Sequence, residues 1–297
     1  MKIVIYTPPR RGEDGVALAE HFAWNIRKQF KSQVPDLQVT VAAGSNDSHI
    51  LSVRVTDAGT TDVTAIKSKL EKQAKVFCCI DQLTLMMHDI DAKRKIVAEI
   101  LKENAENHDG IKFADSFFLH TMEAAYTVSV SALSKLYECG KHQQKTVNFV
   151  WLLTFIKNNL PNLYQRVQAL TPTNIDDYLT LLRQWEGAGG LARKLAKHRN
   201  ELLAHNGQKY FPDPTRFPRI HRLSDGDLNQ LQAKAGEIVQ RCWLAFTGGS
   251  HDLESTVDGD VQRLFQRLRE HRRAAGLAMT IRSIPTPSDT TRLPTAN

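Results

Sequence analysis

The sequence contains few cysteines, and their positions do not form a metal-binding or disulfide pattern. It has 297 residues and four cysteines, Cys78, Cys79, Cys139 and Cys242. None belongs to a C-x-x-C pair, and no histidine lies at the spacing that zinc ligands need. We therefore expect reduced, partly buried thiols, with no metal site and no cofactor.

Long apolar segments are also absent from the sequence. No apolar run is long enough to span a bilayer, and the N-terminus lacks a basic segment followed by an apolar one. Residues Met1–Tyr6 are typical of a buried strand rather than of a signal peptide. These absences predict a cytoplasmic protein that has no membrane partner.

Positive charge exceeds negative charge and is concentrated in two regions. The formal net charge is +7 at pH 7. Between positions 191 and 222 there are eight lysines and arginines and two acidic residues, and from position 262 onward there are seven arginines and two acidic residues. Such clustering favours a polyanionic partner such as RNA, whereas a modest net charge by itself often serves solubility.

The first 72 residues alternate strand-like and helix-like patterns. Three short segments have the composition or alternation of strands: 2–6, 37–41 and 51–55. Apolar residues recur every four positions between them, as in an amphipathic helix: Leu18, Phe22, Ile26 and Phe30. A second helix is expected to begin at Thr61-Asp62 and to continue through Leu70. We therefore predict a small β-α-β-β-α module over residues 1–72.

From position 73 onward the pattern is helical. Five long helical patterns follow one another: 76–105, 113–138, 146–158, 175–204 and 228–246. Gly187–Gly190 interrupts the fourth pattern, and short polar connections separate the others. Short connections between long helices predict an antiparallel bundle over residues 73–250, so the chain is expected to be mainly α-helical.

The last segment, residues 251–297, is a basic tail. Its first part has the apolar spacing of a short helix whose apolar face can dock on the bundle, and five arginines lie on or just after it: Arg263, Arg267, Arg269, Arg272 and Arg273. After Gly276 the composition is rich in Ser, Thr, Pro and Arg, which predicts disorder. The tail either contacts RNA or keeps the protein in solution.

The stretch Lys197–Gly207 (KHRNELLAHNG) carries the strongest chemical signal. Arg199 precedes His205 by six positions, and Asn200 follows the arginine directly. Asn206-Gly207 is a stop signal, so the stretch is expected to form the last turns of a helix. A guanidinium can grip a phosphate, and an imidazole can accept or donate a proton near neutral pH. Arg199, Asn200 and His205 are therefore the candidate catalytic residues for RNA cleavage without a metal ion.

On one helix, Arg199 and His205 do not point at the same place. Six residues correspond to about 9 Å along the axis and about 120° around it, on opposite flanks of an apolar stripe. The stripe is formed by Leu191, Leu195 and Leu202. Two copies of the helix that meet across a two-fold axis can bring two arginines and two histidines into one cleft. The geometry therefore favours a homodimer with a composite site.

The motif and the helices around it resemble the HEPN superfamily of ribonucleases. These enzymes carry an arginine, a polar residue and a closing histidine in an R-x4–6-H motif, which here is Arg199, Asn200 and His205. Phe113-Ala-Asp-Ser-Phe-Phe, the Ala/Ser-rich helix that ends at Leu133–Tyr137, and the Leu-Ala-Arg-Lys-Leu approach are similar to the abortive-infection, AbiU-type branch. The resemblance covers roughly residues 75–250.

The resemblance implies a metal-independent RNA endonuclease that acts as a homodimer. It also implies a role in phage defence or in a toxin–antitoxin system, with a cognate antitoxin or regulator as a possible partner, and products with a 2′,3′-cyclic phosphate and a 5′-hydroxyl. Five residues near the motif are candidate RNA contacts: Arg193, Lys194, Lys197, His198 and Lys209.

Two other interpretations of the sequence stay open. The same basic stripe can bind RNA or a nucleotide without cleaving it. Alternatively, the chain is a helical interaction protein or an antitoxin-like partner whose work is done by the N-terminal module. For His198, packing or support of the motif is the alternative to RNA contact, and for the three basic residues before it a solvated helix face is the alternative.

Overall fold

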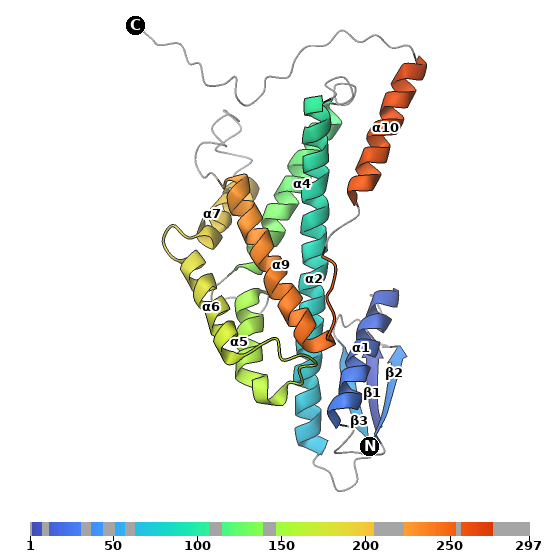
Figure 1. Ribbon diagram of the computed structural model, residues 1–297, viewed down its shortest axis with the longest axis vertical. Helices are drawn as coiled ribbons and strands as arrows, with labels where there is room; N and C mark the ends of the chain where they lie inside the picture. Colours follow the sequence, from blue (N-terminus) through green and yellow to red (C-terminus); the bar gives the residue numbers. More distant parts are fainter. Residues whose placement is uncertain are drawn as a thin grey trace. The chain divides into compact units, whose positions relative to one another are not determined.

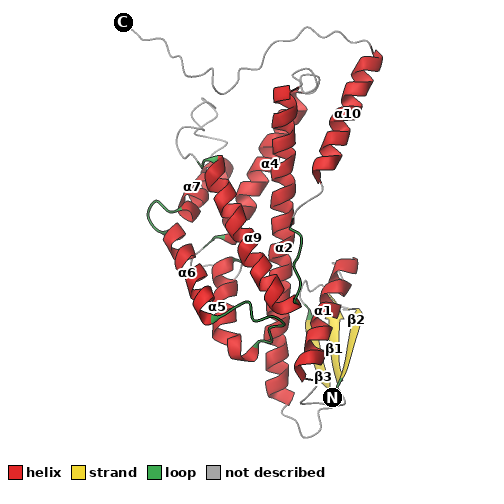
Figure 2. Ribbon diagram, viewed as in Figure 1, coloured by secondary structure: helices red, strands yellow, loops and turns green. Residues whose placement is uncertain are grey.

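Helices dominate the part of the chain that the structure describes. A computed structural model describes residues 2–7, 12–30, 37–43, 51–56, 63–106, 115–138, 147–204, 223–253 and 257–275. Within these ranges, strands occur only in the first 56 residues, and all later elements are helical (Figure 2). The expected mainly α class with a small N-terminal sheet is confirmed, whereas the antiparallel order of the bundle stays a prediction.

The sheet has three strands, and the first strand lies in its centre. β1 (Lys2–Thr7) pairs in parallel with β2 (Gln38–Ala43) and antiparallel with β3 (Ser52–Thr56), in the order β2-β1-β3. α1 (Gly12–Phe30) connects the two parallel strands, which cannot be joined by a tight turn. With the helix that follows β3, the element order is the expected β-α-β-β-α.

α1 packs between the sheet and the helices (Figure 1). Its apolar face, which includes Phe22 and Ile26, is fully buried, as are Ile3 and Ile5 on β1. On the helical side, the Phe22 ring lies 5.4 Å from the Phe77 ring, which in turn lies 6.1 Å from Phe246. This chain of aromatic contacts attaches the N-terminal module to the rest of its unit.

The helix after the sheet differs from the expectation of two separate helices. α2 runs without a break from Val63 to Glu106. The expected junction, Glu71–Lys75, contains neither glycine nor proline and consists of residues with high helix propensity. The helix therefore continues through the position at which the first expected segment, 1–72, meets the second.

Among the described residues between positions 115 and 247, five further helices and one short turn of helix follow. They are α4 (Asp115–Leu136), α5 (Phe149–Asn159), η3 (Leu160–Asn162), α6 (Pro172–Glu186), α7 (Leu191–Ala204) and α9 (Asp225–Thr247). Side-chain caps fix three of the starts: Asn148 accepts a hydrogen bond from Trp151 N, and capping boxes form at Thr171/Asn174 and Ser224/Asp227. The expected interruption at Gly187–Gly190 separates α6 from α7.

The chain divides into two compact units. The first comprises residues 1–91 and 127–255, and the second comprises residues 92–126 and 256–297. In the second unit, α10 (Val257–Ala275) buries Phe265 against Ile100 and Phe118, and Arg269 forms an ion pair with Glu103. The expected tail helix is thus longer than predicted and has an apolar core of its own. The three segments 1–72, 73–250 and 251–297 stay a prediction.

The C-terminal end of α9 is tightly packed. Gly248 ends the helix with φ of 78°, and its N–H donates to Leu244 O at 2.9 Å. The Arg166 side chain lies directly over this glycine and donates from Nη1 to Thr247 O at 2.6 Å. A Cβ atom at position 248 would lie 2.3 Å from Arg166 Cδ. Glycine is therefore needed here for both backbone conformation and space.

Replacement of Gly248 by alanine is expected to destabilise the protein by about 1–2 kcal/mol from the backbone conformation alone, with a further cost from displaced Arg166. The neighbouring Gly249→Ala is the matched control, because nothing lies within 4 Å of a Cβ atom there. Chemical denaturation of both variants measures the difference. Equal stabilities of the two variants would contradict the conclusion that position 248 requires glycine.

Candidate functional site

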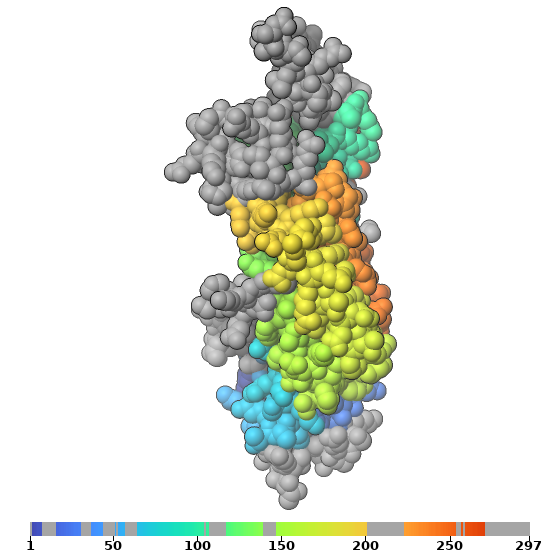
Figure 3. All heavy atoms as spheres, turned by 90° about the vertical axis from the view of Figure 1, so that its left-hand side faces the viewer, coloured from blue at the N-terminus to red at the C-terminus, as the bar shows by residue number. Residues whose placement is uncertain are grey.

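α7, in the first unit, carries Arg199 and Asn200 of the predicted motif. Ala192, Leu195 and His198 are at most 8% exposed and form the buried face of the helix, which packs against α6 and α9. Three of the predicted RNA contacts are exposed on the remaining face: Arg193, Lys194 and Lys197. Figure 3 shows α6 and α7 at the surface, in yellow. The burial of His198 favours a packing role over contact with RNA.

The Arg199 guanidinium is held by its neighbours. Its side chain is 21% exposed, and Nε and Nη2 donate to Asn200 Oδ1 at 3.2 and 3.0 Å. Asn200 itself is exposed. The structure places the amide oxygen of Asn200 on the arginine, where it accepts both hydrogen bonds.

A carboxylate that the sequence analysis did not single out lies beside Arg199. Glu138 follows the end of α4, and its Oε1 is 3.7 Å from Arg199 Nη1. Its side chain is 44% exposed, so the ion pair is partly solvated. The two residues are far apart in the sequence, so no local pattern could have identified the pairing.

Two predicted site residues lie outside the described residues. They are His205 and Lys209. The backbone of α7 is described as far as Ala204, one residue before the histidine. The convergence of Arg199 and His205 therefore stays a prediction.

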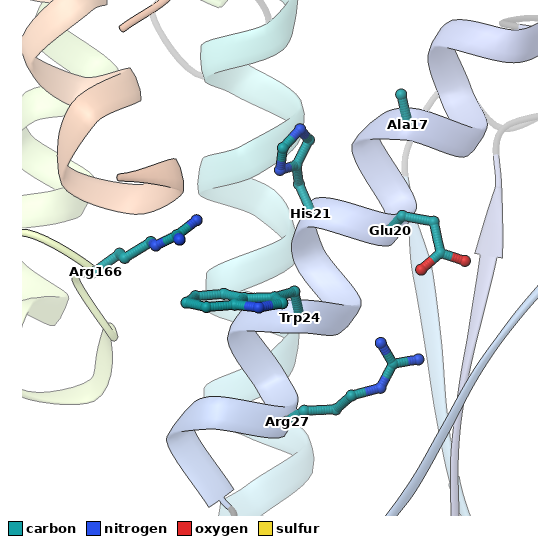
Figure 4. Close-up of a pocket in the computed structure, with 6 residues that line it drawn as sticks. All are labelled: Ala17, Glu20, His21, Trp24, Arg27 and Arg166. Atoms are coloured by element: carbon teal, nitrogen blue, oxygen red, sulfur yellow. The ribbon is translucent and has the colours of Figure 1, made fainter. Parts of the chain in front are cut away.

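A hollow on α1 is a second concentration of basic and aromatic groups. It has a volume of about 410 Å³ and is lined by five α1 residues and Arg166 (Figure 4). The Arg166 guanidinium stacks on the Trp24 ring, 3.8 Å from its centroid, while Nη1 binds Thr247 O. Arg27 Nη2 donates to Val39 O at 3.0 Å. Both arginines therefore have a structural role, since they join α1 to its surroundings.

Two histidines meet where α2 passes the segment after α9. His88 Nε2 lies 3.2 Å from His251 Nε2, and the Trp243 ring packs on the other side of His251. Burial and then the neighbouring His88 lower the pKa of His251, and Asp252 opposes them. The described residues contain no group of three or more side chains that could hold a metal ion. The pair joins α2 to the segment that follows α9.

The described cysteines are unsuited to act as nucleophiles. Cys78, Cys79 and Cys242 are buried free thiols. Burial raises the pKa of Cys242 to about 12, so its sulfur stays protonated at neutral pH. Among the helices of the described ranges, none is long and apolar enough to cross a membrane.

Comparison with known proteins supports the assignment of the helical part. A family model described as AbiU2, of the HEPN class, matches residues 78–264. The matched region contains Glu138, Arg199, Asn200 and His205, and it excludes the sheet and α1. No curated protein and no solved structure matches the chain. The match covers more than half of the chain, and the chain therefore belongs to the AbiU2 family of HEPN domains, a family related to abortive infection.

Proposed function

We propose that the protein is a metal-independent RNA endonuclease that acts in phage defence or in a toxin–antitoxin system. One observation carries the proposal: within the HEPN match, Arg199 and Asn200 lie together on α7, six and five positions before His205 in sequence. A cytoplasmic location, which is an expectation from the sequence, and a cognate antitoxin or regulator, which is an expectation from the family, belong to the same proposal.

The proposed reaction uses the 2′-hydroxyl of RNA as the nucleophile. The 2′-oxygen attacks the adjacent phosphorus while its proton passes to a neutral imidazole, and the bond from phosphorus to the 5′-oxygen breaks. An imidazolium supplies the proton that the leaving 5′-oxygen takes up. The products are a 2′,3′-cyclic phosphate and a 5′-hydroxyl. DNA lacks the nucleophile and is not cleaved by this route.

Each motif residue has a separate role in this proposal. Arg199 stabilises the negative charge that builds on the non-bridging phosphate oxygens. His205 accepts the proton of the 2′-hydroxyl and, as the imidazolium, supplies a proton to the leaving 5′-oxygen; in a two-fold site it acts together with Arg199 of the other chain. Asn200 orients the guanidinium, in agreement with its two contacts at 3.2 and 3.0 Å. Arg193, Lys194 and Lys197 are exposed and are proposed to contact the RNA backbone, together with Lys209.

Incubation with total RNA in the presence of EDTA tests the proposal. Wild-type protein should produce fragments with cyclic phosphate ends, and His205→Ala protein should not. RNA binding without fragments, or fragments that require a divalent metal, would reject the endonuclease. Binding without cleavage would instead support the non-catalytic RNA-binding module.

The alternative of a helical interaction protein needs a test that keeps the fold intact. Deletion of the N-terminal module would expose Phe77, whose ring packs against Phe22. Substitutions on the exposed side of α1, such as His21→Ala, are the better probe. Loss of a partner in a pull-down with unchanged RNA cleavage would favour the interaction protein.

Exposed arginines of α10 are expected to strengthen RNA binding. Arg263 and Arg267 are exposed, and their joint replacement by glutamine should weaken RNA binding. The slope of log K against the logarithm of the salt concentration should become shallower by about 0.7 for each phosphate contact that is lost. Cleavage at saturating RNA should be unchanged. Truncation after Val257 is a poorer test, because it removes the buried Phe265.

Affinity measured at several salt concentrations gives the slope for each variant. Joint replacement of Lys67 and Lys157 by glutamine is the matched control, since both are surface cations paired with carboxylates elsewhere in the chain. Identical slopes for the α10 variant and wild type would leave these arginines with a solubilising role.

A further inference from the structure

The contacts of Arg199 occupy groups that a phosphate would use. Nε and Nη2 point at one oxygen of Asn200, and Nη1 faces the Glu138 carboxylate. A guanidinium grips a phosphate through pairs of parallel N–H donors, so an incoming phosphate competes with these oxygens. Of the two neighbours, only Glu138 carries a negative charge, as a phosphate does.

The position of Glu138 is set by the residue before it. Tyr137 is 3% exposed, and its hydroxyl donates to Leu231 O at 2.5 Å. Its ring lies 5.4 Å from Phe149 and 5.6 Å from Trp185, measured between ring centroids. Glu138 N also donates to Lys135 O at 3.4 Å. The backbone of Glu138 is thus anchored beside α7, within reach of Arg199.

We propose that Glu138 is a positioning residue that takes the place of the RNA phosphate on Arg199 and thereby sets the RNA affinity of the site. The proposal rests on the proposed function. The pair is well suited to be displaced, because it is 3.7 Å long and partly exposed on both sides. Pairs of this kind are weak, whereas a phosphate can accept two hydrogen bonds from one guanidinium.

Displacement leaves the Glu138 charge next to the bound RNA. The carboxylate then repels the phosphate, so the complex with bound RNA is destabilised. An effect on bound substrate and transition state alike changes KM and leaves kcat unchanged. Glu138 is therefore expected to act on KM and on the dissociation constant of RNA.

Substitution of Glu138 by glutamine removes the charge and keeps the size of the side chain. With a fully 2′-O-methylated RNA oligonucleotide, which lacks the attacking hydroxyl, Glu138→Gln should bind about three- to fivefold more tightly than wild type. With cleavable RNA, KM should fall by a similar factor at constant kcat. Glu138→Asp keeps the charge and should behave as wild type.

Glu71→Gln is the matched control. Glu71 pairs with Lys67 at 3.8 Å on the N-terminal part of α2, and its loss changes the net charge by the same amount. Its RNA affinity should equal that of wild type. Thermal unfolding of each variant checks that the fold is retained, which the 44% exposure of Glu138 leads us to expect.

The same substitution in an Arg199→Ala background separates a local effect from a general one. The gain in RNA affinity from Glu138→Gln should disappear there, because the guanidinium for which Glu138 and the phosphate compete is gone. An equal gain in both backgrounds, a gain for Glu71→Gln, or a fall in kcat at constant KM would overturn the proposal. Failure of the wild type to bind the oligonucleotide would reject the proposed function itself, whereas wild-type binding with no gain for Glu138→Gln would reject only the role of Glu138.

Discussion

Replacement of Arg199 by alanine is expected to slow RNA cleavage by about 10²–10³-fold or more, with the fold intact. The guanidinium is the candidate for stabilising the charge that develops on the phosphate oxygens, and loss of one such donor costs on the order of 3–4 kcal/mol in transition-state stabilisation. His205→Ala should be at least as damaging, because it removes the group that transfers protons. Single-turnover cleavage at saturating RNA measures both effects.

Stability should change little in the Arg199 variant. Its contacts with Glu138 and Asn200 involve partly exposed groups, and exposed pairs contribute at most about 1 kcal/mol. Arg183→Ala is the matched control, because Arg183 is an exposed arginine in the last turn of the neighbouring α6. Arg199→Lys keeps the charge but loses the fork of donors, and should recover only part of the rate. A wild-type rate for Arg199→Ala or His205→Ala would reject the catalytic assignment.

Local patterns in the sequence were sufficient to locate most of the elements. The four-residue repeat through Phe22 and Ile26 identified α1, and both side chains are fully buried. The stripe through Leu195 indicated which face of α7 is buried, and Leu195 is 0% exposed. Periodicity works here because the buried face of a helix and the repeat of its apolar residues have the same physical cause.

The continuity of α2 was missed because a change in the pattern of apolar residues was given more weight than the helix propensity of the junction. The pattern of buried residues changes along this helix: Ile66 and Leu70 are buried four positions apart, whereas Val76–Ile80 is buried without a break. A change of pattern looks like the end of one helix and the start of another. Without a glycine or proline, however, the backbone has no cause to leave the helical conformation.

In the candidate site, the sequence predicts contacts between neighbouring residues but not contacts that depend on tertiary packing. Arg199 and Asn200 are adjacent in the chain, so a contact between them can be expected from the sequence. The sequence does not show that the asparagine amide oxygen accepts the hydrogen bonds of the guanidinium. Glu138 comes to Arg199 only because Tyr137 is anchored against Leu231, Phe149 and Trp185. That contact depends on tertiary packing, which the R-x4–6-H pattern does not encode.

The proposed composite site makes a prediction that a site within one chain does not. On an ideal helix Arg199 and His205 are separated by about 9 Å along the axis and about 120° around it, so one chain cannot aim both at one phosphate. Two chains related by a two-fold axis can combine the arginine of one with the histidine of the other. Arg199→Ala and His205→Ala proteins should each be inactive alone and should recover activity when their subunits are exchanged.

The expected size of the recovery follows from the geometry of a two-fold dimer. Random exchange makes half of the dimers mixed, and each mixed dimer holds one intact arginine–histidine combination, so activity should reach roughly a quarter of the wild-type value. Mixing His205→Ala with the Arg199→Ala/His205→Ala double variant is the control. It should restore no activity, because neither subunit carries His205. Light scattering should show a dimer throughout. A stable monomer that cleaves RNA, or inactive mixtures after verified exchange, would place the complete site in one chain, and bending of the chain after Ala204 would then have to bring His205 to the side of Arg199.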